Sequence, residues 1–302
     1  MKNIAFGYST RCNITCRHCV AAGEQHDKTK MELQQAKNSI NELAATGVTG
    51  ISFTAGEPTL YFDDLLELIE LCTSHKIYTR VVTNSFWAKD VTSTKTHIAA
   101  LRDAGLCQLR LSYSRWHQEY VPAINVCHAA RECLTAGIDY FVSFVTDFSE
   151  KDETYEQFLR DNSIKFFPEP LIYSGRAKNY LKEKLFTDYH DNRCAMNCYL
   201  APDFNMYACC DAGSHFTKTK AFLLGNLKDE SAKTLFAKYD SDPLYHCIRN
   251  IGLSAIASYS GMSSREIVTF RKCELCEKLL NHPETYNKLR TEAQHHLQNW
   301  HR

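Results

Sequence analysis

Short apolar runs alternate with longer amphipathic segments through residues 4–167 of the chain. The runs cover residues 4–8, 51–54, 77–82, 109–112, 140–145 and 164–167, and each has the length and composition of a buried strand. Segments such as residues 31–45 and 121–135 lie between them and carry apolar residues at helical spacing. The pattern therefore predicts six strands that alternate with helices.

Three glycines mark the ends of predicted helices. Gly47, Gly105 and Gly137 each follow a helix-like segment and precede one of the apolar runs. A glycine just past a helix adopts, at little steric cost, the left-handed conformation that ends the helix. The glycines thus support the same strand–helix repeat.

Such a repeat predicts an α/β fold in which helices cover a sheet of parallel strands. Six units are fewer than the eight of a closed barrel, so we expect a partial, open (β/α)6 TIM-like barrel. In barrels of this kind the chemistry lies in the loops that follow the strands. Candidate site residues are therefore expected directly after each apolar run.

The repeat stops after about residue 178, and the remaining chain is dense in cysteine. Residues 200–209 have the order of apolar and turn-forming residues expected of a hairpin, with residues 202–205 as its turn. We therefore predict a barrel domain over residues 1–185 and a smaller domain over residues 186–302 that ends in a helical segment.

Charge and composition weigh against several classes of function. Lys plus Arg equals Asp plus Glu, 35 each in 302 residues, so no basic excess favours nucleic acid or an anionic membrane. The N-terminus lacks the apolar core of a signal peptide, and no run approaches the length of a membrane-spanning helix. Fourteen cysteines without a secretion signal indicate metal sites and reduced thiols in a cytoplasmic protein.

The loop after the first run contains the strongest chemical signal. Cys12, Cys16 and Cys19 follow one another at C-x-x-x-C-x-x-C spacing. Three thiolates can hold three irons of a [4Fe–4S] cluster and leave the fourth iron open to a small molecule, whereas purely structural clusters use four cysteines. The alternative is a zinc site or buried core thiols, although zinc loops usually pair two C-x-x-C units.

This loop resembles the signature of the radical S-adenosylmethionine (radical SAM) enzymes, except that His18 stands where the family usually has an aromatic residue. The resemblance implies that the open iron chelates S-adenosyl-L-methionine, and that an electron from the cluster cleaves it to a 5′-deoxyadenosyl radical. That radical abstracts a hydrogen atom from the substrate. The family also has a (β/α)6 partial barrel, in agreement with the pattern of strands.

A second motif follows the second predicted strand. Ala55, Gly56 and Glu57 precede a proline and resemble the family's Gly-Gly-Glu-Pro segment, with alanine in place of the first glycine. The resemblance implies that they bind the amino group of S-adenosylmethionine, and carbonyl and carboxylate oxygens suit an ammonium ligand. The alternative is an ordinary turn that ends in proline.

Polar residues also follow the third and fourth predicted strands. Thr83, Asn84 and Ser85 are candidates for contacts with the ribose hydroxyls, or they simply end the strand. Ser112 falls where related enzymes place a serine near the methionyl carboxylate. Arg115 is a candidate carboxylate clamp because its planar fork suits bidentate pairing.

The C-terminal third resembles the twitch/SPASM extension of the family. A Gly-Arg-Ala segment at residues 175–177, frequent in members with such an extension, precedes it. The resemblance implies a second, auxiliary [4Fe–4S] cluster held by Cys194, Cys209, Cys273 and Cys276. A zinc ribbon or buried thiols are the alternative.

Cys198 and Cys210 are neighbouring alternatives to Cys194 and Cys209 as ligands. With Cys247 they are also the candidates for a hydrogen-atom donor, because radical SAM epimerases use one cysteine thiol to return hydrogen to the opposite face of a substrate carbon. We place Cys247 first, then Cys210 and Cys198.

The leading hypothesis is epimerisation at a carbon of a sugar-type or aminoglycoside-like natural product, or of a peptide. Oxidation through the auxiliary cluster, giving a dehydrogenated or crosslinked product, is the main alternative. A non-catalytic iron–sulfur electron carrier is the alternative from another class. An enzyme of this kind needs an external electron donor such as flavodoxin or ferredoxin.

Overall fold

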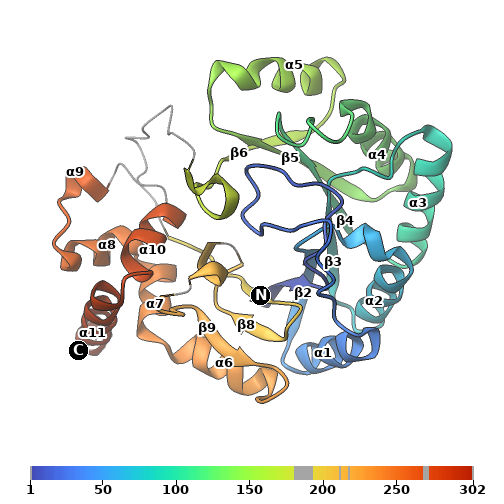
Figure 1. Ribbon diagram of the computed structural model, residues 1–302. Helices are drawn as coiled ribbons and strands as arrows, with labels where there is room; N and C mark the ends of the chain where they lie inside the picture. Colours follow the sequence, from blue (N-terminus) through green and yellow to red (C-terminus); the bar gives the residue numbers. More distant parts are fainter. Residues whose placement is uncertain (1, 180–192, 211, 217, 268–271, 301–302) are drawn as a thin grey trace.

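The computed structural model describes residues 2–179, 193–210, 212–216, 218–267 and 272–300 (Figure 1). The six predicted strands are present and pair in parallel with their neighbours in chain order. They are β1 (Lys2–Gly7), β2 (Val48–Thr54), β3 (Tyr78–Thr83), β4 (Gln108–Tyr113), β5 (Asp139–Thr146) and β6 (Phe166–Pro170). The predicted parallel α/β organisation is therefore confirmed.

Five helices connect these strands and lie along the outer side of the sheet (Figure 1). They are α1 (Leu33–Ala45), α2 (Phe62–Ser74), α3 (Val91–Asp103), α4 (Ala123–Ala136) and α5 (Glu153–Asp161). Carboxylate side chains cap the N-termini of some of these helices. At α3 the Asp90 side chain accepts a hydrogen bond from the Ser93 amide. Gly47, Gly105 and Gly137 have φ of 80°, 94° and 74°, so the predicted left-handed helix ends are confirmed.

The chain after the sixth strand adds three short strands to the same sheet, at the edge formed by β1. The short strands β7 (Cys198–Leu200), β8 (Asn205–Tyr207) and β9 (Leu223–Asn226) follow, and β7 pairs in parallel with β1. Strands β7 and β8 form the predicted antiparallel hairpin, and β9 pairs with β8. The order in the described sheet is β6-β5-β4-β3-β2-β1-β7-β8-β9. The predicted boundary between residues 185 and 186 lies outside the described residues.

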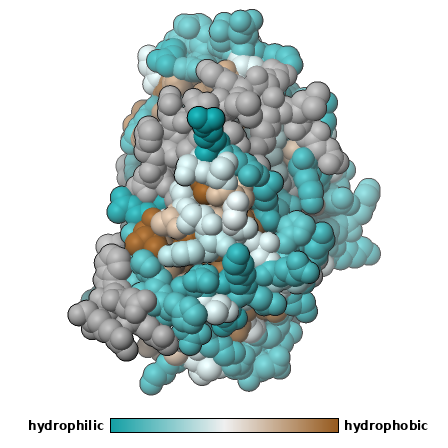
Figure 2. Space-filling view, turned by 90° about the vertical axis from the view of Figure 1, so that its left-hand side faces the viewer, coloured by the Kyte–Doolittle hydropathy of each residue, from teal (hydrophilic) through white to brown (hydrophobic). Residues whose placement is uncertain are grey.

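Helices make up the rest of the C-terminal part and pack beside the hairpin (Figure 1). They are α6 (Ala232–Ser241), α7 (Pro243–Asn250), α8 (Leu253–Ala257), α9 (Ser264–Ile267), α10 (Lys272–Leu280) and α11 (Pro283–Trp300). None of the helices in the described ranges is long and apolar enough to cross a membrane. The face turned toward the viewer in Figure 2 is largely hydrophilic apart from a small hydrophobic area.

The two faces of the parallel sheet differ in character because successive side chains of a strand point to opposite sides. The outward residues Phe53, Val81 and Leu111 are fully buried in the main hydrophobic core. Their sequence neighbours Ser52 and Arg110 line a cavity on the other face. The helices therefore cover one apolar face and leave a polar inner face that is partly hollow.

Candidate active site

A cavity of about 160 Å³ lies at the carboxyl ends of strands β1 to β4. All three cysteines of the first loop line it, as do the loops after the next three strands. Its lining includes Cys12, Cys16, Cys19, His18, Ala55, Gly56, Glu57, Thr83, Asn84, Ser112, His117 and Arg176. The structure thus brings most of the residues predicted for the cluster and for S-adenosylmethionine to one place.

Arg176 fixes the conformation of the cysteine loop. Its guanidinium donates to the carbonyl of Cys16 over 2.8 Å and to the carbonyl of Gly23 over 3.0 and 3.1 Å. Its amide donates to the carbonyl of Cys19 over 3.1 Å. Gly175 before it has φ of 57°, and a Cβ there would lie 2.4 Å from the Val20 carbonyl oxygen. The Gly-Arg-Ala segment therefore packs against the cysteine loop and stabilises its conformation by these hydrogen bonds.

The three thiols form a donor set that suits an iron–sulfur cluster. Burial raises the pKa of Cys12 to about 12 and raises the pKa of Cys16 as well, and each of these thiols also lies close to the thiol of Cys19. Among the described residues, no three His, Cys, Asp or Glu side chains surround one point as a single bound ion requires. In a [4Fe–4S] cluster each of three thiolates would instead bind a separate iron, and the positive charge of the iron–sulfur core would offset the cost of burying the thiolates.

The second motif packs its backbone directly on the cysteine loop. Gly56 has φ of 56°, and a Cβ at this position would lie 2.2 Å from the Arg11 carbonyl oxygen. The Glu57 amide donates to that same oxygen over 2.8 Å. Ala55 also has a left-handed conformation, with φ of 63°. Ala55 and Gly56 line the cavity, where an ammonium group could be bound.

Glu57 connects the second motif to the loop after β3. The carboxylate is 2% exposed and accepts hydrogen bonds from the Thr59 amide and hydroxyl and from the Asn84 amide. Burial raises its pKa. With these donors in place, the carboxylate positions two loops in addition to lining the cavity.

The three predicted residues after β3 differ in whether they border the cavity. The Asn84 side chain lines the cavity and donates to the Asn13 carboxamide oxygen over 2.9 Å. The Thr83 hydroxyl also borders the cavity, but it accepts hydrogen bonds from the Ser85 amide and the Trp87 indole. Ser85 is fully buried and lines none of the four cavities described here. Thr83 and Asn84 therefore border the cavity with side chains that already have partners within the protein, and Ser85 does not border it.

Ser112 and Arg115 after β4 have different surroundings. Ser112 lines the cavity, as the resemblance implies. The Arg115 guanidinium binds Asp147 over 3.0 Å and Asp152 over 2.8 Å. Burial alone would raise the pKa of Asp147, but the bond from Arg115 holds it well below its usual range. Arg115 is occupied by this buried ion pair and does not line the cavity, so the structure gives it a supporting position.

An aromatic stack beside the cavity was not foreseen from the sequence. His18 stacks on Trp116 with ring centroids 4.9 Å apart and meets His117 edge-on at 4.6 Å. Arg115 lies 4.1 Å above the Trp116 ring on the far side. Tyr113 at the end of β4 packs in the core against Phe144 and Phe158. Ring stacking depends on loops distant in the chain, which a linear pattern does not reveal.

The four cysteines predicted as a second ligand set are all partly buried against the main core. Cys273 and Cys276 lie three residues apart at the start of α10 and share one face of that helix. Burial raises the pKa of Cys276, and the nearby thiol of Cys194 raises it further. A Cβ on Gly213 would lie 2.9 Å from the Cβ of Cys209, and the turn containing Gly213 packs against α10. These contacts place Cys276 near Cys194 and the turn after Cys209 beside α10.

The three candidate donor thiols have contrasting positions. Cys247 lies on α7 and is 1% exposed in the main core, and Cys198 on β7 is 3% exposed with a pKa raised to about 12 by burial. Cys210 is exposed and lines two larger cavities, of about 480 and 430 Å³. Both of these cavities share Thr54 with the cysteine cavity, and the second also shares Gly56. Cys210 is thus the donor candidate next to the site.

Comparisons with known proteins agree with the motifs. A model of the radical SAM superfamily matches residues 7–161. The putative peptide biosynthesis protein YydG of Bacillus subtilis (strain 168) is 22% identical over 306 residues, which cover 95% of this chain and 94% of that protein. The PqqA peptide cyclase of Bradyrhizobium diazoefficiens is 33% identical over 105 residues, which cover 34% of this chain and 26% of that one.

Solved structures share the fold. That of tagged anSMEcpe with bound AdoMet superposes with a TM-score of 0.59 at 14% identity, covering 99% of this chain and 98% of the other. That of BtrN in complex with AdoMet and 2-DOIA gives a TM-score of 0.51 at 14% identity, covering 85% and 89% of the two chains. At such low identity these likenesses concern the fold alone.

Proposed function

Because this chain belongs to the radical SAM superfamily, we propose that it modifies a peptide by epimerisation, with Cys210 as the hydrogen-atom donor. As a radical SAM enzyme it uses a [4Fe–4S] cluster and S-adenosylmethionine. The reaction, the substrate and the role of each residue are the parts that we propose.

Cys12, Cys16 and Cys19 would hold the cluster, and Gly56, Asn84 and Ser112 border the space that S-adenosylmethionine would enter. When bound, the cluster and S-adenosylmethionine would together supply a 5′-deoxyadenosyl radical able to remove one hydrogen atom from the substrate. Arg176 and Glu57 keep the loops in place by their hydrogen bonds.

A peptide is favoured over a sugar as the substrate. The similarity to YydG, which is named a peptide biosynthesis protein, extends over nearly the whole of both chains. The similarity to the PqqA peptide cyclase, although confined to a third of this chain, also supports a peptide substrate. Two cavities of about 480 and 430 Å³ adjoin the cysteine cavity and offer room for side chains of a peptide.

The observation that carries the proposal is the exposure of Cys210 where both large cavities meet. A hydrogen donor must reach the substrate carbon, and Cys247 and Cys198 are enclosed in the core. The sequence prediction that placed Cys247 first is therefore replaced. The difference in burial supports this choice, and the spacing of cysteines along the chain does not contain that information.

In the proposed reaction the thiol of Cys210 gives its hydrogen atom to the substrate carbon, on the face opposite the one that lost hydrogen. One C–H bond forms and one S–H bond breaks, so the product is an isomer of the substrate. The thiyl radical left on Cys210 is restored by one electron from a low-potential donor, such as a flavodoxin or ferredoxin, and one proton from water.

We further propose that Cys194, Cys209, Cys273 and Cys276 hold an auxiliary cluster in a twitch/SPASM-like domain over residues 186–302. The proximity of Cys276 to Cys194 and the packing of the turn after Cys209 against α10 support a shared metal group. Such a cluster, beside Cys210, could pass the restoring electron. It is also what the alternative reaction needs, in which the substrate radical is oxidised to a dehydrogenated or crosslinked peptide.

The test uses the anaerobically reconstituted enzyme with S-adenosylmethionine, dithionite and a pool of synthetic aliphatic peptides. Products are hydrolysed, and their residues are resolved on a chiral column. We expect D-residues from the parent enzyme and from Cys247→Ala, and 5′-deoxyadenosine without D-residues from Cys210→Ala. Products of lower mass by two hydrogens, or D-residues that persist in Cys210→Ala and disappear in Cys247→Ala, would overturn the proposal.

A further inference from the structure

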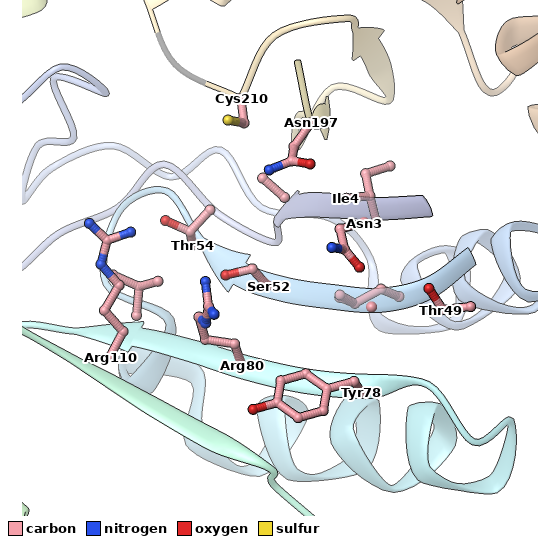
Figure 3. Close-up of a pocket in the computed structure, with 14 residues that line it drawn as sticks. Asn3, Ile4, Thr49, Ser52, Thr54, Tyr78, Arg80, Arg110, Asn197 and Cys210 are labelled. Carbon is pink, nitrogen blue, oxygen red and sulfur yellow. The ribbon is translucent and has the colours of Figure 1, made fainter. Parts of the chain in front are cut away.

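The largest of the four cavities lies against the inner face of strands β1 to β4, below Cys210 (Figure 3). Its volume is about 480 Å³. Thr54 at its upper end also borders the cysteine cavity, whereas Tyr78 at the start of β3 lies at its lower end. A group bound in this cavity would therefore lie below the carbon that exchanges hydrogen.

Two arginines from neighbouring strands extend into this cavity. Arg80 of β3 and Arg110 of β4 both line it, and Figure 3 shows their guanidinium groups directed to the same side as Cys210. The ring of Phe141 on β5 supports both, with the guanidinium carbons 5.5 and 5.7 Å from its centroid. The Nε of Arg80 donates to the Gln108 side chain over 2.6 Å. These contacts fix both guanidinium groups next to each other.

The charges of the two arginines are not equally compensated. Arg110 forms an ion pair with Glu169 of β6 and donates to the Ser143 hydroxyl over 2.9 Å. Arg80 has no carboxylate within ion-pair distance among the described residues. Its pKa is lowered, first by burial and then by the nearby charge of Arg110. The carboxylates of Glu169 and Asp139 act on Arg80 from beyond ion-pair distance in the described part of the chain, and a bound anion would relieve the repulsion between the two arginines.

We propose that Arg80 and Arg110 bind a carboxylate of the peptide substrate in this cavity, and thereby select which residue is presented to Cys210. The proposal rests on the function proposed above and names the substrate class more closely: a peptide with an acidic group near its reacting residue. The other lining groups, among them Ser52, Thr49 and Asn3, are neutral and leave the arginines as the dominant charges. A planar guanidinium suits bidentate binding of a carboxylate.

Binding is measured by titration calorimetry on the reconstituted holoenzyme with saturating S-adenosylmethionine. The probes are N-acetyl-Val-Glu-Val-amide, N-acetyl-Val-Gln-Val-amide and N-acetyl-Val-Gln-Val with a free C-terminal carboxylate. We expect at least one carboxylate peptide to bind about ten-fold or more tightly than the neutral amide, a difference typical of a charge-assisted pair. Which of the two binds tightly identifies the carboxylate as a side chain or a C-terminus.

Three variants test the assignment to Arg80. Arg80→Gln should remove the preference for carboxylate peptides, and Arg80→Lys, which keeps the charge, should retain part of it. Arg102→Gln is the matched control, because Arg102 is exposed on α3 and pairs only with its neighbour Asp103 in the contacts described. Equal binding of the three peptides by the parent enzyme, or an undiminished preference in Arg80→Gln, would overturn the proposal. Weaker S-adenosylmethionine binding by Arg80→Gln with unchanged peptide preference would also overturn it.

The binding assay separates this inference from the proposed reaction. Selective binding of a carboxylate peptide, with no D-residue formed from any peptide, would refute the epimerase proposal and leave the anion site in place. D-residues formed equally from acidic and neutral peptides would refute the anion site alone.

Discussion

Replacement of Gly56 by alanine tests how closely the second motif packs on the cysteine loop. Gly56 has φ of 56°, and a Cβ would lie 2.2 Å from the Arg11 carbonyl oxygen. An ordinary contact needs about 3.4 Å, so one of the two loops must move by about 1 Å. Gly47 has an even larger φ of 80° but nothing within 4 Å of an added Cβ. Gly47→Ala is therefore a control that also places alanine in the left-handed region but causes no collision.

Both variants should lose stability because a non-glycine residue in the left-handed region costs about 1–2 kcal/mol. In a chain of this size that corresponds to a few degrees in the melting temperature. Only Gly56→Ala displaces the backbone that borders the cavity, and a displacement of about 1 Å at an active site can lower the rate about 100-fold. We expect Gly47→Ala to retain most of the parent rate.

The assay is the rate of reductive cleavage of S-adenosylmethionine by the reconstituted proteins, measured as 5′-deoxyadenosine by chromatography. Melting temperatures and iron content are measured on the same samples. If Gly56→Ala cleaves S-adenosylmethionine as fast as Gly47→Ala, the close packing of the two loops does not matter for the site. The structural reasoning from the 2.2 Å approach would then be refuted.

Three further outcomes follow from contacts in the structure. Removing Cys273 and Cys276 together should lower the iron of the reconstituted protein from about eight to about four per chain, and an unchanged iron count would contradict the second cluster. Arg176→Ala removes three hydrogen bonds to the cysteine loop, so anaerobic dilution should release iron at least several-fold faster than from the parent; equal release would contradict that role. Asp147→Asn leaves Arg115 short of one buried partner and should cost about 3 kcal/mol in urea unfolding near neutral pH. Because the pKa of Asp147 is lower in the folded protein, its carboxylate contributes fully to the free energy of unfolding above the unfolded pKa of 3.8. This contribution is lost as the pH falls through the lower folded pKa. The difference in unfolding free energy between the parent and Asp147→Asn should therefore shrink only below about pH 4.

Local patterns in the sequence were sufficient for the parallel sheet. The apolar runs at residues 51–54 and 109–112 lie within β2 and β4, and Gly137 ends its helix in the left-handed conformation as predicted. These features depend on neighbours within a few residues. The hairpin of β7 and β8 was predictable for the same reason, whereas its parallel pairing with β1 depends on residues almost 200 positions away and was not.

The structure brings some of the predicted site residues to one cavity and places others elsewhere. The spacing of Cys12, Cys16 and Cys19 is local, and the structure does bring the three thiols to one cavity. Arg115 was expected at the cofactor, but it is occupied by Asp147, which lies 32 positions away. Cys247 was preferred over Cys210 because a linear sequence contains no measure of burial. In both cases the deciding information is tertiary.

The most direct test of the central claim is the reaction carried out in heavy water. A thiol exchanges its hydrogen with solvent, so Cys210 would carry deuterium to the substrate carbon. The account predicts one non-exchangeable deuterium in each epimerised peptide, located by fragmentation at the D-residue, and one 5′-deoxyadenosine formed for each product. An epimerised peptide that contains no solvent deuterium would contradict a thiol donor and with it the assignment of Cys210.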